Sequence, residues 1–238
     1  MLLKEQITGE KQNELSIVSE FLTPLWVKGR IVSADALHTQ HAFCTCVRRW
    51  GGHYLLIAKD NQACLRQDLE LFFSEPPPDC RDWRTARTVN KGHGRLEIRE
   101  IVVSTELNEF LGEQCTGVAQ VFRLTRTVTE DDQTSTEVVY GITSLSPTQA
   151  GARRLLDLMR EHWAIENRLH WRRDVTLRED ACQVRKGEAP RVLAVLNSFL
   201  LALLDWQGVA NVPHQIRIFD ARPALAVRLL LGSLLTFK

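Results

Sequence analysis

The hydrophobic pattern of the chain changes twice, and these changes constrain the fold more than any other feature. Up to about residue 78, short apolar runs alternate with helix-like stretches, which is typical of α/β layering. Between residues 84 and 143 apolar residues follow the period of strands, and after Pro147 they follow the spacing of helices. The sequence therefore predicts an α/β fold in which a β-rich segment interrupts the core and the C-terminal part is helical.

The breaks in this pattern mark the expected elements. In the first part we expect strands at residues 2–7, 30–36 and 53–58, and helices at 13–25, 39–50 and 63–73. Pro24 stops the first helix, and Gly51 with Gly52 ends the second. The middle part predicts two hairpins, with strands at 85–89, 96–104, 117–128 and 136–142. The last part predicts helices at 148–173, 189–205 and 223–235.

Charge excludes a histone-like polycation but leaves nucleic acid open as a partner. The 238 residues contain 30 Lys and Arg against 29 Asp and Glu, a net charge of +1. Residues 151–191 alone contain ten basic and seven acidic side chains, an excess of three. Because binding depends on where charge lies, this local excess keeps phosphate binding possible.

Cysteine usage and the N-terminus indicate a cytoplasmic protein. The six cysteines include no C-x-x-C pair and no zinc-ligand spacing, which is typical of reduced thiols. The first ten residues lack the apolar run of a signal peptide. The longest apolar run, residues 192–204, is shorter than the roughly 20 residues of a bilayer span, so we expect no membrane association.

Asp35 is the first candidate site residue. It stands near the C-terminal end of an apolar strand and just before a helix, where α/β sheets collect ligand-binding groups. From this residue alone, a turn or helix-capping role is favoured over a binding site, since Asp is a common cap.

Glu166 is the second candidate. On a helix, Leu155, Met159, His162 and Glu166 share one stripe at 4-3-4 spacing. A carboxylate among packing residues is costly unless it is paired, hydrogen-bonded or bound to metal. A buried ion pair and a metal ligand are therefore both open.

Tryptophans and arginines accompany Glu166. Trp163 and Trp171 lie roughly two turns apart. They are surrounded by Arg160, Arg168, Arg172 and Arg173. This combination suits phosphate binding with base stacking, but composition alone favours an Arg-rich solvated helix face with core tryptophans.

Taken together, these segments resemble a known family. Residues 162–175 read HWAIENRLHWRRDV and are followed by Glu179 and Asp180. They are similar to the C-terminal signature of the H-repeat-associated DDE transposases, which belong to the insertion-sequence superfamily. Further similar stretches follow in family order at residues 11–14, 33–40, 52–62, 92–99 and 185–190.

The resemblance implies a fold, a reaction and a site. It implies a ribonuclease-H-like mixed sheet flanked by helices. It also implies an enzyme that cuts and joins DNA by phosphoryl transfer with two bound Mg²⁺ (or Mn²⁺) ions. Asp35 and Glu166 match two catalytic, metal-binding carboxylates. Where the wider superfamily has a Tyr, an Arg and a Lys around that Glu, this chain has Met159, His162 and Arg173.

The implied partners are insertion-sequence ends and target DNA, and the implied assembly is a homo-oligomer. The residues expected to contact DNA surround the two carboxylates in the family pattern. They are Lys59, Asn61, Arg160, His162, Trp163, Asn167, His170, Arg172 and Arg173.

One departure from the family concerns its first carboxylate. The family places it on the first strand in a D-G-K-like context, but residues 1–34 contain no Asp. Because that context is missing, we expect an N-terminally truncated transposase. Two of the three ligands should hold Mg²⁺ poorly, so we also expect impaired catalysis. The alternatives are a DNA-binding or interaction remnant without catalysis, and a poorly folding remnant.

The same resemblance divides the chain into four regions. We expect a first part of the core at 1–78, the β-rich insertion at 79–144, a helical second part of the core carrying Glu166 at 145–205, and a C-terminal tail with a helix at 206–238.

Overall fold

A computed structural model of the chain describes residues 22–34, 39–92, 94–165 and 171–235. The chain divides into two compact units. We call the part that ends at His162 the sheet unit and the part that begins at Trp163 the helical unit, and each is described by itself.

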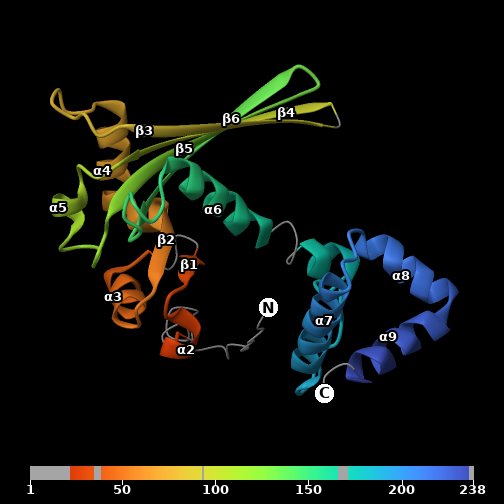
Figure 1. Cartoon of the computed structure of the whole chain (residues 1–238). Coiled ribbons are helices and arrows are strands. Elements are labelled where there is room, and N and C mark those ends of the chain that lie inside the picture. The colour runs from red at the N-terminus through yellow and green to blue at the C-terminus, as the bar shows by residue number, and fades with distance from the viewer. Residues whose placement is uncertain (1–21, 35–38, 93, 166–170, 236–238) are drawn as a thin grey trace. The chain divides into compact units, whose positions relative to one another are not determined.

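The sheet unit is built on one mixed sheet of six strands (Figure 1). The strands are β1 (Ile31–Ala34), β2 (His53–Ala58), β3 (Arg84–Gly92), β4 (Arg95–Ser104), β5 (Gln120–Glu130) and β6 (Gln133–Thr143). Their order is β1-β2-β6-β5-β4-β3, with β1 and β2 parallel and every other pair antiparallel. The mixed α/β class expected from the sequence is confirmed.

Two tight hairpins set the register of the long antiparallel strands. In the first, Gly92 pairs with Arg95, next to Gly94, whose φ of 76° suits glycine. In the second, Glu130 pairs with Gln133. Asp131 and Asp132 form its two-residue turn with φ of 47° and 62°, as a type I′ turn requires. Both predicted hairpins are confirmed.

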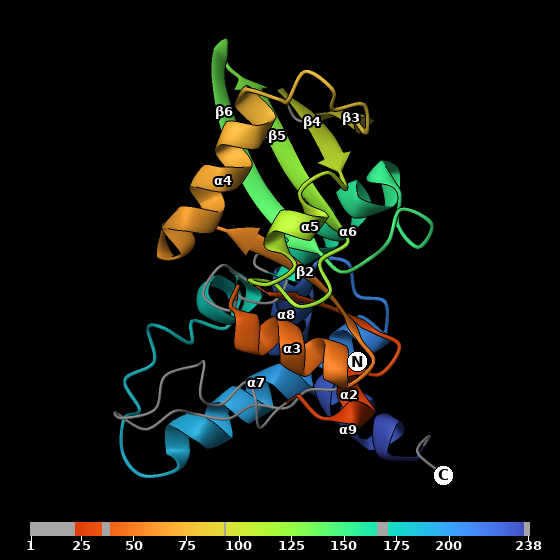
Figure 2. The same cartoon turned by 90° about the vertical axis from the view of Figure 1, so that its left-hand side faces the viewer.

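One face of the sheet packs against α3 (His41–Arg49), α4 (Ala63–Ser74) and the short α5 (Asn108–Leu111). Figure 2 shows α4 crossing the strands on this face. The buried α4 side chains repeat at helical spacing and meet alternate residues of β4, β5 and β6, among them Val102, Val121 and Tyr140.

The opposite face packs against α6 (Ala152–Ile165). Ile101, Phe122 and Leu124 point to this face and are fully buried, as are Leu155 and Leu156 on the helix. Close packing extends to the backbone, since a Cβ at Gly141 of β6 would collide with the Leu56 carbonyl oxygen and the Phe122 ring.

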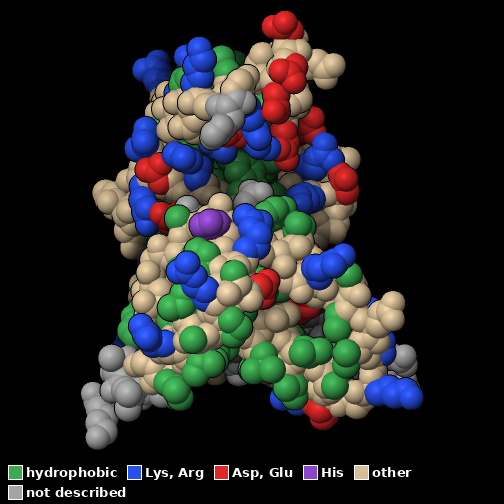
Figure 3. Space-filling model, turned by 90° about the vertical axis from the view of Figure 1, so that its right-hand side faces the viewer, with side chains coloured by type: hydrophobic (Ala, Val, Ile, Leu, Met, Phe, Trp, Pro, Cys, Tyr) green, Lys and Arg blue, Asp and Glu red, His purple; other side chains and the backbone are tan. Residues whose placement is uncertain are grey.

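The helical unit contains the π-helical turn Arg172–Thr176, α7 (Ala189–Trp206), α8 (Val212–Ala221) and α9 (Pro223–Leu235). In the lower half of Figure 3, where these helices lie, hydrophobic side chains gather on the surface. The exposed apolar residues of α7 include Val192, Val195, Leu196 and Phe199. By length and composition alone α7 passes as a membrane span, a test that core helices of soluble proteins also pass.

The boundaries of several elements differ from those expected. In the described part of the helix expected at 13–25, α2 (Pro24–Val27) begins at Pro24 after the cap residue Thr23, because proline fits the first helical turn. The helix expected from residue 148 begins at Ala152, and the chain turns before it. The sequence prediction lacked α5 and α8. The strand expected at 2–7 and residues 13–21 lie outside the described residues.

Candidate functional site

The ends of β1 and α6 meet on one face of the sheet. His162 Nδ1 lies 3.1 Å from Ser33 Oγ, and both side chains are partly buried. This is the face that packs against α6. Ser33 points to it because it pairs with Leu55 in the parallel β1–β2 register, and paired residues share a face. His162 reaches it because it continues the buried stripe of Leu155 and Met159 on α6.

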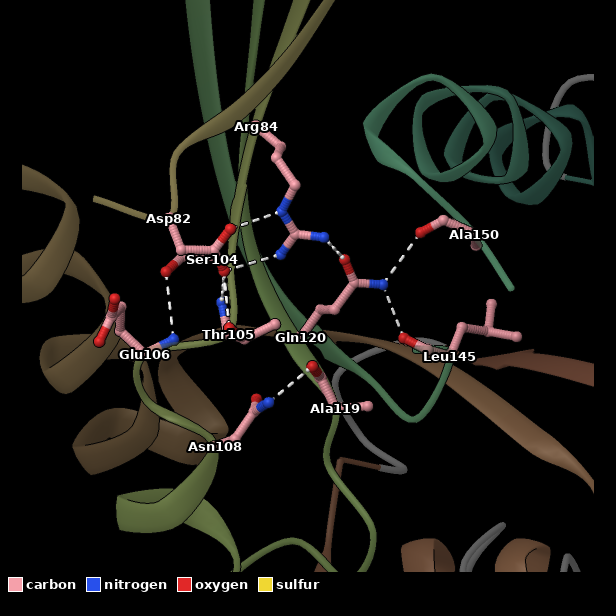
Figure 4. Close-up of polar contacts among 10 residues, drawn as sticks. All are labelled: Asp82, Arg84, Ser104, Thr105, Glu106, Asn108, Ala119, Gln120, Leu145 and Ala150. Atoms are coloured by element: carbon pink, nitrogen blue, oxygen red, sulfur yellow. Dashed lines mark hydrogen bonds and ion pairs between the residues drawn. The ribbon is translucent and has the colours of Figure 1, made fainter. Parts of the chain in front are cut away.

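The start of α6 is held to the sheet by a buried polar network (Figure 4). Gln120 Nε2 donates to the carbonyl oxygens of Leu145 (2.6 Å) and Ala150 (2.9 Å), in the segment that leads from β6 into α6. Gln120 Oε1 accepts a hydrogen bond from Arg84 Nη1 at 2.8 Å. This amide therefore fixes where α6 leaves the sheet.

Asp82 extends the network beyond Arg84. Its carboxylate accepts bonds from Arg84 Nε (2.8 Å) and from the amide and hydroxyl of Thr105 (2.8 and 2.6 Å). Burial raises the pKa of Asp82, but the bonds from Thr105 and Arg84 outweigh it, so the pKa lies below its ordinary value. The network ties the start of β3 to the end of β4.

The two candidate carboxylates lie outside the described residues. Asp35 directly follows β1, and Glu166 directly follows α6. The predicted DNA contacts Asn167 and His170 also lie outside the described residues. Among the residues that the structure does describe, no group of three His, Cys, Asp or Glu side chains is arranged to hold a metal ion.

Two predicted DNA contacts follow β2. Lys59 and Asn61 are exposed just beyond its last residue, Ala58. Nearby, the hydroxyl of Thr39 donates to the Ile57 carbonyl oxygen at 2.6 Å, so the chain after β1 returns to the end of β2. Carboxyl ends of adjacent parallel strands thus lie at one edge of the sheet, the usual place for ligand-binding groups. Arg160 on α6 is also exposed.

Two predicted DNA contacts in the helical unit are engaged in ion pairs. Arg173 binds Glu179 through Nε and Nη2, at 2.8 and 2.6 Å, and Arg172 Nη1 lies 2.6 Å from Asp205 Oδ1. The guanidinium of Arg173 lowers the pKa of Glu179 below its ordinary value. Glu179 is already counted in the excess of residues 151–191, so of these two pairs only the Arg172–Asp205 pair reduces that excess, by one charge.

The predicted tryptophans differ in exposure. Trp163, the first residue of the helical unit, is partly buried, whereas Trp171 is exposed. Of the two, only Trp171 presents a ring largely to solvent.

A basic cluster on the sheet was missed by the sequence analysis. Arg95, Arg99 and Arg126 surround Glu97 on the face that packs against α6. The alternation of charged and apolar residues from Arg95 to Arg99 was the available signal, since period two places the charged ones on one face.

Comparison with known proteins identifies the family. Residues 1–204 match the family described as "Transposase DDE domain". The chain is 31% identical over 206 residues to two proteins of Escherichia coli (strain K12), "Putative protein YbfL" and "H repeat-associated putative transposase YhhI". It is 29% identical over 213 residues to "Putative transposase YncI" of Escherichia coli O157:H7.

These matches cover most of this chain but only part of each relative. They include 83% of the chain for YbfL and YhhI and 86% for YncI. In each case they cover 53% of the relative, so the chain spans about half the length of the curated relatives it matches. The chain belongs to the DDE transposase family.

Proposed function

We propose that this chain supplies Asp35 and Glu166 as two metal-binding carboxylates of a transposase that cuts and joins DNA. The observation that carries the proposal is the 3.1 Å contact between His162 and Ser33. Asp35 follows Ser33 by two residues, and Glu166 follows His162 by four. A contact so near both carboxylates along the chain supports a shared site.

The donor chemistry supports this assignment. Asp and Glu provide the oxygen ligands that Mg²⁺ and Mn²⁺ prefer. Two such ions, when bound, activate the attacking water or 3′-hydroxyl and stabilise the in-line phosphoryl transition state. The contribution of this chain is to supply the carboxylates, and His162, four residues before Glu166 in the sequence, is proposed to contact a phosphate of the bound DNA.

The reaction is proposed to be impaired in the 238-residue chain. Residues 1–34 provide no Asp for the first ligand position of the family, so the chain has two of the three carboxylates. We expect weak Mn²⁺ binding and little cleavage of supercoiled plasmid in Mg²⁺ or Mn²⁺.

Titration calorimetry with Mn²⁺ tests the site directly. Binding to the wild-type chain should be lost in Asp35→Ala and in Glu166→Ala. Glu161→Ala is the matched control, because it removes an exposed carboxylate of α6 that pairs only with Arg154 among the described residues. Binding that survives in both site variants contradicts the ligand assignment. Efficient plasmid cleavage that depends on Asp35 and Glu166 contradicts the impairment instead.

A second function, DNA binding without catalysis, is supported by the arginine cluster on the sheet. Calorimetry separates the two, because a binding module takes up DNA and shows no uptake of Mg²⁺. We further propose that the protein acts at insertion-sequence ends and on target DNA as a homo-oligomer. Light scattering of the DNA complex tests that assembly, and a single copy per DNA end pair would contradict it.

A further inference from the structure

Strand β4 presents a row of charged side chains on one face. Arg95, Glu97 and Arg99 alternate along the strand, and Arg99 lies directly opposite Arg126 of β5 and Thr88 of β3. Ile101 continues the same row and is fully buried. The charged row therefore begins where the apolar packing under α6 ends.

Three guanidinium groups converge on a single carboxylate oxygen. Oε1 of Glu97 lies 2.5 Å from Arg126 Nε, 2.8 Å from Arg99 Nη2 and 3.6 Å from Arg95 Nη2. Arg126 also reaches the exposed Glu137, at 3.4 Å, and Glu130 stands opposite Arg95 near the hairpin tip. Around Glu97 itself positive charge exceeds negative charge.

The centre of this cluster, Arg99 with Glu97, is shielded from water. The Arg99 side chain is only 13% exposed and that of Glu97 14%. Within the described part of the chain, Nε of Arg95, Nε of Arg99 and the hydroxyl of Thr88 are buried without a hydrogen-bond partner. These buried donors have no acceptor among the described residues, whereas the side chains of Arg95 and Arg126 are 40% and 30% exposed, so an anion can reach them from solvent.

Neighbouring positive charges also favour the binding of an anion here. Burial lowers the pKa of Arg99, and the charges of Arg160 and Arg126 lower it further, against the opposing effect of Glu97. Arginine nevertheless stays protonated in proteins, so the charge must be compensated by another means. Arg160 belongs to α6, which brings a fourth guanidinium near this face.

We propose that Arg95, Arg99 and Arg126, with Arg160, form a binding site for a phosphate of the DNA backbone. Guanidinium forks match the paired oxygens of a phosphodiester, and Glu97 holds them in place before DNA arrives. Contacts of this kind position DNA and do not read its sequence. The site deepens the proposed function by naming a DNA contact that needs no metal ion.

Fluorescence anisotropy with a labelled duplex, in EDTA and over a range of salt concentrations, tests the site. We expect Arg99→Gln and Arg126→Gln each to weaken binding about tenfold, the effect of losing a charge-assisted hydrogen bond. The slope of log K against log salt should fall by about 0.9 for each phosphate that the variant no longer neutralises. Arg126→Lys should keep the slope yet lose affinity, since it keeps the charge without the fork.

Arg87→Gln is the matched control, because Arg87 is exposed on the other face of the neighbouring strand β3. Circular dichroism melts report folding, and the exposed Arg160→Gln provides a test if Arg99→Gln unfolds the chain. Folded variants that bind like wild type overturn the site, as does an equal loss in Arg87→Gln. If inorganic phosphate binds while DNA affinity is unchanged in the variants, the DNA assignment is wrong.

The outcome is separable from that of the metal site. Wild-type chain that does not bind duplex in EDTA overturns this inference and leaves the Mn²⁺ titration unaffected. Loss of Mn²⁺ binding in the carboxylate variants, conversely, says nothing about the arginine cluster.

Discussion

Replacing Gln120 by Met removes the amide that joins α6 to the sheet and keeps a side chain of similar shape. Two carbonyl oxygens, of Leu145 and Ala150, then lose their donor, and both residues are buried. An unsatisfied buried acceptor costs about 1–3 kcal/mol. Arg84 also loses a partner, but it is partly exposed and water can replace it. We therefore expect the free energy of unfolding to fall by about 2–6 kcal/mol.

Urea unfolding followed by far-UV circular dichroism measures this loss. Gln67→Met is the matched control, because Gln67 is exposed on α4, and its replacement should change stability by less than about 0.5 kcal/mol. A loss below about 1 kcal/mol in Gln120→Met refutes the reasoning, since it means that the two carbonyls find other donors.

Two further predictions concern packing and pH. Gly141→Ala should cost about 3 kcal/mol because its Cβ meets the Leu56 backbone, whereas Gly151→Ala, with open space around it, should be nearly neutral in the same urea assay. Burial raises the pKa of Glu97, but its arginine neighbours outweigh this and the pKa lies below its ordinary 4.5. Its stabilisation is thus complete above about pH 4.5 and is lost as pH falls through the folded pKa. Urea titrations should show that Glu97→Gln loses less stability in acid than wild type; parallel losses would contradict this.

Local signals account for the part of the fold that the sequence predicted. Strand β2 and helix α9 occur at their expected residues because glycine or proline marks their starts and apolar residues dominate both segments. Helix α8 was missed although its start carries two helix signals. Asn211 caps it by accepting a hydrogen bond from the His214 amide at 3.0 Å, and Pro213 lies in its first turn. Asn followed by Pro looks like a loop signal, yet it also begins helices.

The candidate site depends more on contacts between distant residues. The family signature points to Asp35 and Glu166, but the meeting of Ser33 with His162 spans 129 positions, and no local pattern predicts it. The arginine cluster depends on which strands become neighbours. Arg99 and Arg126 face each other only through the β4–β5 register, which the periodicity of one strand cannot reveal.

The strand order separates quick steps of folding from slow ones. Strands β3 to β6 form a meander in which each strand pairs with the next along the chain, while Tyr54 of β2 bonds to Ser144 across 90 residues. Closing so long a loop carries an entropy cost before any contact compensates it. We expect β1 and β2 to join a meander that has already formed. Pulsed hydrogen exchange during refolding should find the amides of β4 and β5 protected before those of β2, and the reverse order would contradict this sequence of events.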